Sequence, residues 1–89
     1  MPSEIKIDLH EVFNRSEGID RALNDAFRQA ERRRAKSLQI IHGKGSGQLK
    51  KRVARFLQLP YVKAVTRNVE NDSKNWGRVF VYFKWPERS

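Results

Sequence analysis

Residues 40–47 read IIHGKGSG, so a short apolar run ends at a histidine and a glycine-rich basic loop. An amphipathic pattern follows, and the segment therefore predicts a strand, a loop and the first turn of a helix. Glycine adopts positive φ without steric cost, so the backbone N–H groups of this loop can converge at the helix start, where the helix dipole also favours an anion. The predicted phosphate-binding residues of the loop are Gly43, Lys44, Gly45, Ser46 and Gly47.

The loop does not match the two common nucleotide-binding signatures. A Walker A loop has four residues between its first glycine and a Gly-Lys-Ser/Thr sequence, and that order is missing here. The dinucleotide fingerprint requires a third glycine where this chain has Gln48. The alternatives that remain are a phosphate-binding loop of another kind and a plain turn that joins a strand to a helix.

Charge indicates the partner of the chain. The 89 residues contain 19 Lys and Arg against 10 Asp and Glu, which leaves a net charge of +9. Such an excess favours a polyanionic partner, and nucleic acid is the first candidate. A membrane surface is less suitable, because the predicted helices also carry acidic residues and an apolar stripe that faces the core.

Length and composition predict a single intracellular domain. It covers residues 1–89, with 1–4 as a loose end and 86–89 as the C-terminal end. No segment approaches the roughly 18 apolar residues of a membrane span, and the N-terminus lacks the apolar region of a signal peptide. Because the sequence has no cysteine, disulfides and cysteine zinc sites are excluded, and we expect a cytoplasmic protein.

The first predicted strand alternates strictly between apolar and polar side chains. This period of two places Ile5, Ile7 and Leu9 on the core face. Asp8 and His10 share the opposite face, and at about 3.3 Å of rise per residue their attachment points lie roughly 6–7 Å apart. That spacing permits a carboxylate–imidazole hydrogen bond or a shared ligand.

An apolar stripe at helical spacing follows and predicts a helix capped by Asn14 or Ser16. The members of the stripe are Ile19, Leu23, Ala26, Phe27 and Ala30. The C-terminal end of this helix is basic, with Arg32, Arg33 and Arg34 in succession. These arginines suit the helix dipole, and they equally suit a phosphate backbone, to which we assign them.

Residues 37–41 predict the second strand, and residues 46–58 predict a second helix that ends at Leu59 and Pro60. The apolar side of this helix is formed by Leu49, Val53, Phe56 and Leu57. On its solvent side, the basic residues assigned to nucleic-acid binding are Lys50, Lys51 and Arg55.

The last part of the chain predicts two more strands. Residues 61–69 alternate weakly and predict the third strand, which a turn at 71–75 follows. Residues 79–83 are apolar at every position, and this predicts a central strand covered on both faces. The order of elements is then βαβαββ, an α/β two-layer domain in which right-handed crossovers leave both helices on one face of the sheet.

Parallel pairing of the first two strands would bring two motifs together. The carboxyl ends of parallel strands lie at one edge of the sheet, where open α/β sheets bind their ligands. His10 and the loop at His42 are therefore expected to emerge at the same edge.

The motif IDLH at residues 7–10, followed by HGKG at residues 42–45, resembles the paired L-D-x-H and H-G-x-G signatures of the Smr (small MutS-related) domain. The likeness covers nearly the whole chain. It implies a four-stranded mixed sheet of order 1-2-4-3 with strand four antiparallel and two helices on one face, similar to the C-terminal domain of bacterial translation initiation factor three. It also implies nucleic-acid binding and, in several members, endonuclease activity as a DNA nickase or on messenger RNA at ribosomes.

The chain departs from the family pattern at two places. Glu11 stands where the family usually has glycine directly after its first motif. The glycine-rich lead into the last strand is reduced to residues 75–78. These departures weaken the implied catalytic activity more than the implied fold.

Cleavage of a phosphodiester by an endonuclease is the function that these residues favour. His10 and His42 form a candidate general acid–base pair, since imidazole titrates near neutral pH. Asp8 orients His10, while the loop amides and Lys44 hold the scissile phosphate and stabilise its developing charge. With RNA, the 2′-hydroxyl supplies the nucleophile, so no metal cofactor is required.

A divalent metal is the alternative, with Asp8, His10 and Glu11 as candidate ligands. One clear carboxylate on the site face is, however, a poor set for magnesium, which prefers oxygen ligands. The competing function is a nucleic-acid-binding module without chemistry, including one that docks on the ribosome. The sequence leaves open whether the substrate is DNA or RNA, and it leaves the oligomeric state open.

Four side chains near the C-terminus are candidates for stacking on unpaired bases: Trp76, Arg78, Tyr82 and Trp85. Aromatic side chains and arginine offer flat surfaces to which a base of any kind can bind. Packing in or around the core is the alternative role for the three aromatic residues.

Overall fold

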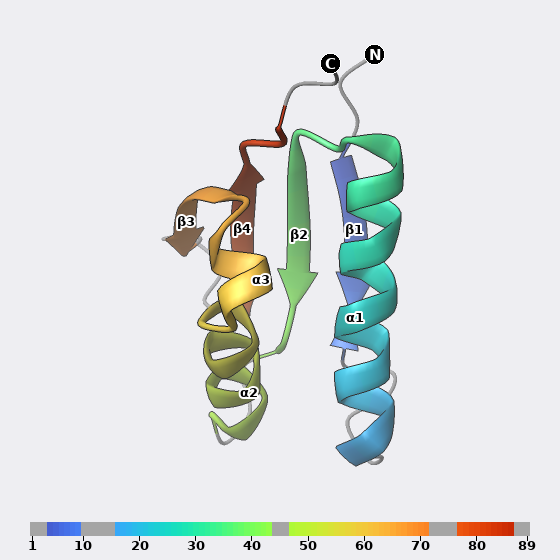
Figure 1. The fold of residues 1–89 in the computed structure, drawn as a ribbon. Helices are drawn as coiled ribbons and strands as arrows, with labels where there is room; N and C mark the ends of the chain where they lie inside the picture. Colours follow the sequence, from blue (N-terminus) through green and yellow to red (C-terminus); the bar gives the residue numbers. More distant parts are fainter. Residues whose placement is uncertain (1–3, 10–15, 44–46, 72–76, 87–89) are drawn as a thin grey trace.

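The computed structural model describes residues 4–9, 16–43, 47–71 and 77–86 of the chain. They form two layers, a four-stranded sheet and the helices that cover one of its faces (Figure 1). The elements in chain order are β1 (Glu4–Asp8), α1 (Ser16–Arg33), β2 (Ser37–Ile41), α2 (Gln48–Leu57), α3 (Pro60–Lys63), β3 (Thr66–Asn71) and β4 (Arg78–Phe83). The predicted α+β two-layer architecture is confirmed.

The sheet has the order β1-β2-β4-β3. Strand β1 is parallel to β2, and β4 is antiparallel to both of its neighbours, β2 and β3. The expected order and the mixed character of the sheet are therefore confirmed. Because β1 and β2 run in the same direction, their carboxyl ends lie at the same edge of the sheet (Figure 1).

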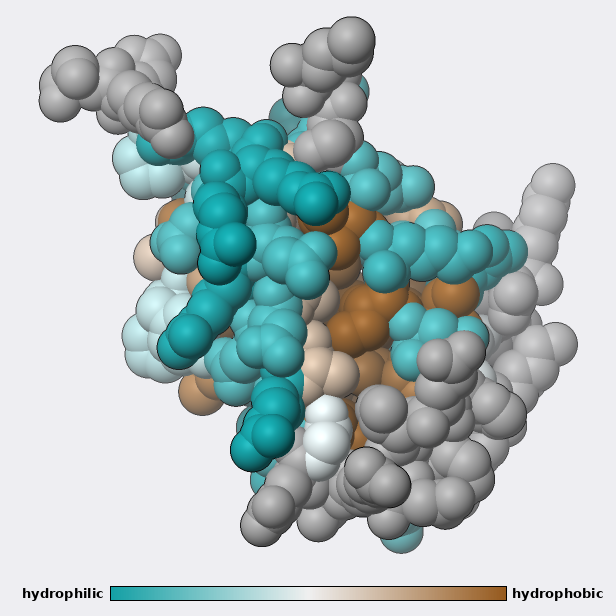
Figure 2. Space-filling model, turned by 90° about the vertical axis from the view of Figure 1, so that its right-hand side faces the viewer, coloured by the Kyte–Doolittle hydropathy of each residue, from teal (hydrophilic) through white to brown (hydrophobic). Residues whose placement is uncertain are grey.

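Helix α1 forms because its apolar residues recur at spacings of three and four and so share one face. The five residues of the predicted stripe are all buried: Ile19, Leu23, Ala26, Phe27 and Ala30. The outer face of the helix is hydrophilic, as Figure 2 shows from the side that carries α1 and β1. Helix α2 buries Val53, Phe56 and Leu57 in the same way, while Leu49 is half-buried.

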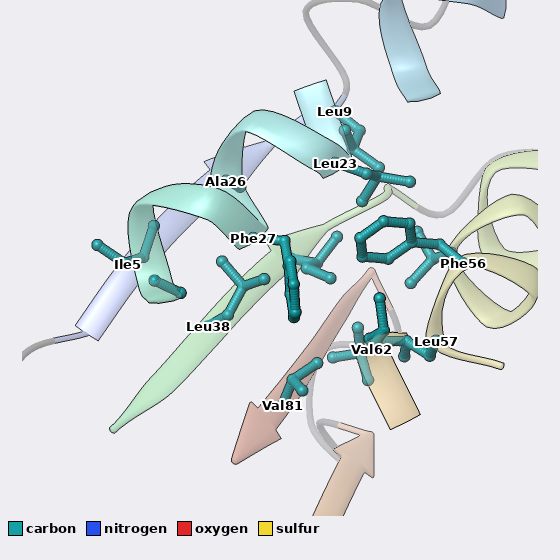
Figure 3. Close-up of a cluster of buried hydrophobic side chains, with 14 of the residues drawn as sticks. Ile5, Leu9, Leu23, Ala26, Phe27, Leu38, Phe56, Leu57, Val62 and Val81 are labelled. Carbon is teal, nitrogen blue, oxygen red and sulfur yellow. The ribbon is translucent and has the colours of Figure 1, made fainter. Parts of the chain in front are cut away.

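The core lies between the helices and the sheet, with Phe27 of α1 near its centre (Figure 3). The ring of Phe27 packs edge-on against Phe56 and Phe83, with 6.1 Å between the ring centroids in each pair. Trp85 stacks on Phe83 at 4.6 Å, and its indole N–H donates to the carbonyl of Ala35 at 2.7 Å. Of the two roles considered for Trp85, the structure therefore shows packing at the rim of the core.

The third predicted strand, residues 61–69, is wrong in its first half. The chain forms the short helix α3 there, and β3 begins only at Thr66. Pro60 starts this helix because its fixed φ suits a first helical position, where a missing N–H costs nothing. Leu59 is extended just before it, and Val62 anchors the turn in the core with none of its surface exposed.

The predicted turn at residues 71–75 begins inside β3, since Asn71 is the last residue of that strand; the rest of the turn lies outside the described residues. Trp76, a candidate for base stacking, also lies outside them.

Strand β4 occupies the predicted central position in the sheet but is covered on one face only. Val79, Val81 and Phe83 are buried in the core, whereas Phe80 and Tyr82 are half-buried on the opposite face. The expectation of burial on both faces is therefore wrong. An entirely apolar sequence alternates in burial here because the helices cover a single face of the sheet.

Candidate functional site

At the carboxyl ends of β1 and β2, the backbones of two predicted site residues lie near each other. Asp8, the last residue of β1, pairs with Ile41, the last residue of β2, and His42 follows directly. Asp8 is exposed and lies on the face opposite buried Ile5. His10, the predicted partner of Asp8, lies outside the described residues.

His42 is held in place by its own loop and by Gly77. It is only 4% exposed although it follows a strand end directly. Its backbone N–H donates to the carbonyl oxygen of Gly77 at 2.7 Å, and the N–H of Gly43 donates to the same oxygen at 3.1 Å. The Nδ1 atom of His42 lies 2.9 Å from the carbonyl oxygen of Gly43. Because a carbonyl oxygen only accepts, Nδ1 carries the proton and the neutral imidazole keeps its lone pair on Nε2.

Burial also sets the protonation state of His42. Desolvation lowers the pKa of the imidazole from its ordinary value of 6.5, the hydrogen bond with the Gly43 carbonyl opposes this, and the charge of Lys50 lowers the pKa further. The net effect is a lowered pKa, so His42 is neutral at physiological pH. A neutral imidazole whose lone pair is on Nε2 can accept a proton there and has none to donate from that atom.

Gly77 belongs to the site, although the sequence analysis did not assign it a role there. A Cβ at this position would lie 3.1, 3.2 and 3.3 Å from the Cα, carbonyl carbon and nitrogen of Gly43. A side chain at this position would push the Gly43 backbone away by a few tenths of an ångström, so glycine suits this close approach. Gly43 itself has a φ of 79°, which glycine adopts without strain. The available sequence signal was the glycine just before the apolar run of residues 79–83.

The start of helix α2 is electropositive. Gly47 caps it with a φ of 89° and no side-chain hydrogen bond, and the first turn contains no acidic residue. The positive end of the helix dipole is therefore not neutralised by a carboxylate of that turn, and Lys50 adds a full charge close by. The predicted loop residues Lys44, Gly45 and Ser46 lie outside the described part of the chain.

The basic residues of α2 do not form one continuous site. Lys50 and His42 line the same groove, which opens between α2, α3 and β3. Arg55 lines a separate hollow together with Asp20 and Asn24 of α1. Lys51 is exposed. Among the three predicted binding residues of α2, the structure therefore joins Lys50 most directly to His42.

The arginines at the end of α1 lie far from His42. Helix α1 runs from the edge where β1 ends to the opposite edge of the sheet (Figure 1). Its 18 residues span about 27 Å at about 1.5 Å per residue. Arg32, Arg33 and Arg34 are exposed at that far end, where Arg34 donates a hydrogen bond to the carbonyl of Pro86. The structure does not bring these arginines together with the loop at His42.

The described ranges hold no cluster of three or more His, Cys, Asp or Glu side chains arranged for a metal ion. Two of the candidate metal ligands, His10 and Glu11, belong to a part of the chain outside these ranges. No helix within the same ranges is long and apolar enough to cross a membrane.

Comparison with solved structures identifies the same fold elsewhere. The crystal structure of the Smr domain of Thermus thermophilus MutS2 is similar to this chain, with a TM-score of 0.70, and the match covers 92% of this chain and 98% of that one. The two sequences are 15% identical, so this similarity shows the fold alone. A comparison with curated proteins gives no match.

Comparison with protein families gives the stronger result. The family model of the Smr domain matches residues 7–84, a range that contains Asp8, His42 and Gly77. The match spans most of the 89 residues, and the expected strand order agrees with it. The chain therefore belongs to the Smr domain family, whose members are nucleic-acid-binding modules.

Proposed function

We propose that this chain is an endonuclease that cleaves a phosphodiester bond at the edge of the sheet where β1 and β2 end. The observation that carries the proposal is the state of His42, a neutral imidazole whose Nδ1 proton is directed to Gly43 and whose Nε2 can accept a proton. It follows the strand residue that pairs with Asp8. The net charge of +9 and the family of the chain support nucleic acid as the substrate.

His42 acts as the general base on the 2′-hydroxyl of RNA. Its Nε2 takes the hydroxyl proton while the 2′ oxygen bonds to phosphorus and the bond between phosphorus and the 5′ oxygen breaks. His10, oriented by Asp8, donates a proton to the leaving 5′ oxygen. The products are a 2′,3′-cyclic phosphate and a 5′-hydroxyl, and the two histidines end with their protonation states exchanged.

The loop and the start of α2 bind the phosphate. The positive end of the helix dipole and the charges of Lys44 and Lys50 stabilise the negative charge that develops around phosphorus. This mechanism requires no metal; a divalent cation at Asp8, His10 and Glu11 is the alternative arrangement. The proposed compartment is the cytoplasm, in keeping with the absence of cysteine.

Replacement of Asp8 and His10 by alanine tests this proposal. Asp8 is exposed, so its loss removes no core packing. We expect Asp8→Ala and His10→Ala to melt near the parent, to bind RNA nearly as well, and to lose cleavage by about 10²–10⁴-fold. The measurement is single-turnover cleavage of end-labelled RNA and DNA between about pH 5 and pH 9, with and without chelator.

Lys6→Ala is the matched control, because Lys6 is exposed on the same face of β1 as Asp8. It should cleave like the parent. If His10→Ala cleaved as fast as the control, the acid–base assignment would be wrong. If the parent cleaved neither RNA nor DNA under any of these conditions, the nuclease proposal would fail as a whole.

A nucleic-acid-binding module without catalysis is the second candidate function, and the burial of His42 favours it. His42 is only 4% exposed, and its N–H and that of Gly43 both donate to the carbonyl of Gly77. A histidine with a purely structural role would have the same burial and the same fixed backbone. In that role the loop and α2 hold RNA, DNA or the ribosome without cutting. His42→Ala would then lower stability and affinity together, and the parent would show no cleavage.

A further inference from the structure

A groove of about 470 Å³ opens between α2, α3 and β3, and it shares His42 and Lys50 with the candidate site. Strand β3 is an edge strand that pairs with β4 alone, and its residues are exposed apart from half-buried Thr66. A register shift between Thr66 and Asn68 marks a bulge. The bulge explains how Arg67 and Asn68, which are consecutive residues, both line the groove.

The lining of this groove combines three kinds of surface. Its apolar residues include Val53 and Leu57 of α2 together with Val69 of β3, and Val69 keeps 39% of its surface exposed. Its cationic residues are Lys50, Lys63 and Arg67. Its side-chain amides are Gln58, Asn68 and Asn71. None of the described lining residues is acidic, and none is Phe, Tyr or Trp.

We propose that this groove receives the base and sugar of one unpaired nucleotide, with the neighbouring phosphate near His42 and Lys50, so that the substrate is single-stranded. This inference rests on the proposed function and specifies its substrate class. Apolar side chains can cover the face of a base, amides can donate to and accept from its edge, and the cations can bind the flanking phosphates. The volume lies in the range of ordinary small-ligand sites, about 300–1,000 Å³.

A paired base cannot use such a groove, because its edge and faces are occupied within the helix. Recognition in a pocket therefore requires an unpaired or extruded base. The main competing occupant is an extended acidic peptide that adds to the free edge of β3. We favour nucleic acid because the groove is continuous with His42 and Lys50, which belong to the predicted phosphodiester site.

Val69→Glu tests the inference, because it places a negative charge on the apolar wall at a position that the core does not need. Gln29→Glu, on the exposed side of α1, is the control with the same change of charge. The measurement is fluorescence anisotropy of a labelled single-stranded RNA and of a blunt duplex of the same sequence, at one fixed salt concentration. Thermal melting followed by circular dichroism reports whether each variant is folded.

We expect the parent to bind the single strand more tightly than the duplex. Val69→Glu should weaken single-strand binding by at least about tenfold, because a bound base would take the new carboxylate out of water at an apolar wall. Its effect on duplex binding should be no larger than that of Gln29→Glu. Asn71→Asp, which changes an amide at the end of β3 and leaves the core untouched, should show the same selectivity and replaces Val69→Glu if that variant fails to fold.

Two results would overturn the inference while the proposed function survives. One is equal affinity of the parent for single strand and duplex, together with Val69→Glu and Asn71→Asp variants that lose as much affinity for the duplex as for the single strand. The other is unchanged RNA binding by Val69→Glu combined with loss of binding to an extended Glu-Val repeat peptide, which would assign the groove to a peptide. If the parent bound neither RNA nor duplex, the proposed function itself would fail.

Discussion

The carbonyl of Gly77 fixes the backbone that carries the histidine of the second motif. Two consecutive N–H groups, those of His42 and Gly43, donate to this oxygen and fix the backbone that carries the imidazole. The sequence predicted His42 and Gly43 as site residues from their position between a strand and a helix. It did not assign Gly77 to the site: the glycine before the apolar run at 79–83 was visible, but its contact with Gly43 joins segments that are distant in the sequence.

Acid should destabilise the fold through His42. The pKa of this imidazole is lowered from 6.5 in the folded chain, so the unfolded chain binds the proton more strongly. By linkage, this contribution to stability is fully present above about pH 6.5 and is lost as the pH falls through the lowered pKa of the folded state. The melting temperature of the parent should therefore drop more between about pH 7.5 and pH 5.5 than that of His42→Gln. Equal drops would contradict the buried neutral state, and His10→Gln reports how much the other histidine contributes.

Alanine at Gly77 should disturb both stability and activity. The added Cβ meets the backbone of Gly43 at 3.1 to 3.3 Å, closer than backbone atoms readily tolerate. We expect a loss of about 1–3 kcal/mol in the free energy of unfolding, measured in urea, together with loss of cleavage. Gly47→Asn is the contrast for packing alone, since no atom lies within 4 Å of a Cβ there and the remaining cost is the strain of a positive φ, which asparagine tolerates better than most residues. If Gly77→Ala were as stable as the parent, the close approach of the two glycines would not be needed.

The buried face of an element could be predicted where one strong period governs the segment. The stripe of α1 and the alternation of β1 both correspond to burial in the structure. The failure at α3 has a specific cause: residues 61–65 are too few to reveal a helical period, and their weak alternation resembled a strand. Proline at the first position of a helix was the signal that outweighed this alternation.

The two sides of α2 should contribute unequally to binding and cleavage. Lys50 lines the groove with His42, whereas Arg55 lines the hollow between α2 and α1. Lys50→Gln should therefore lower RNA affinity and cleavage more than Arg55→Gln, although each removes one positive charge. Electrophoretic mobility shifts and cleavage rates at equal protein concentration give the comparison. Equal effects would mean that α2 binds as a diffuse charged surface.

At the scale of the whole molecule, the order of elements was enough to predict a two-layer α/β domain with both helices on one face of the sheet. The order β1-β2-β4-β3, which the structure has, was implied by the resemblance to the Smr domain and not by the pattern of elements itself. The groove between α2 and β3 could not be predicted, because it depends on α3 and on the bulge in β3. Neither feature follows from a regular pattern in the sequence.

The net charge of +9 predicts binding that weakens steeply with salt. Each phosphate neutralised on a single strand contributes about −0.7 to the slope of log affinity against log salt, and each on a duplex about −0.9. Replacement of Lys50 by glutamine should make the slope less steep by about the contribution of one phosphate contact. A titration of labelled RNA at several salt concentrations measures the slope, and affinity that does not depend on salt would exclude the electrostatic account.

Cleavage of an RNA with a single 2′-deoxy substitution at the scissile position tests the role of His42 as a base most directly. The parent should cut the unmodified RNA in the presence of EDTA and leave a 2′,3′-cyclic phosphate and a 5′-hydroxyl. The deoxy substitution should abolish that cut, because the group from which His42 takes the proton is missing. Cleavage of the substituted strand at the same rate, or cleavage that requires a divalent cation, would contradict the mechanism.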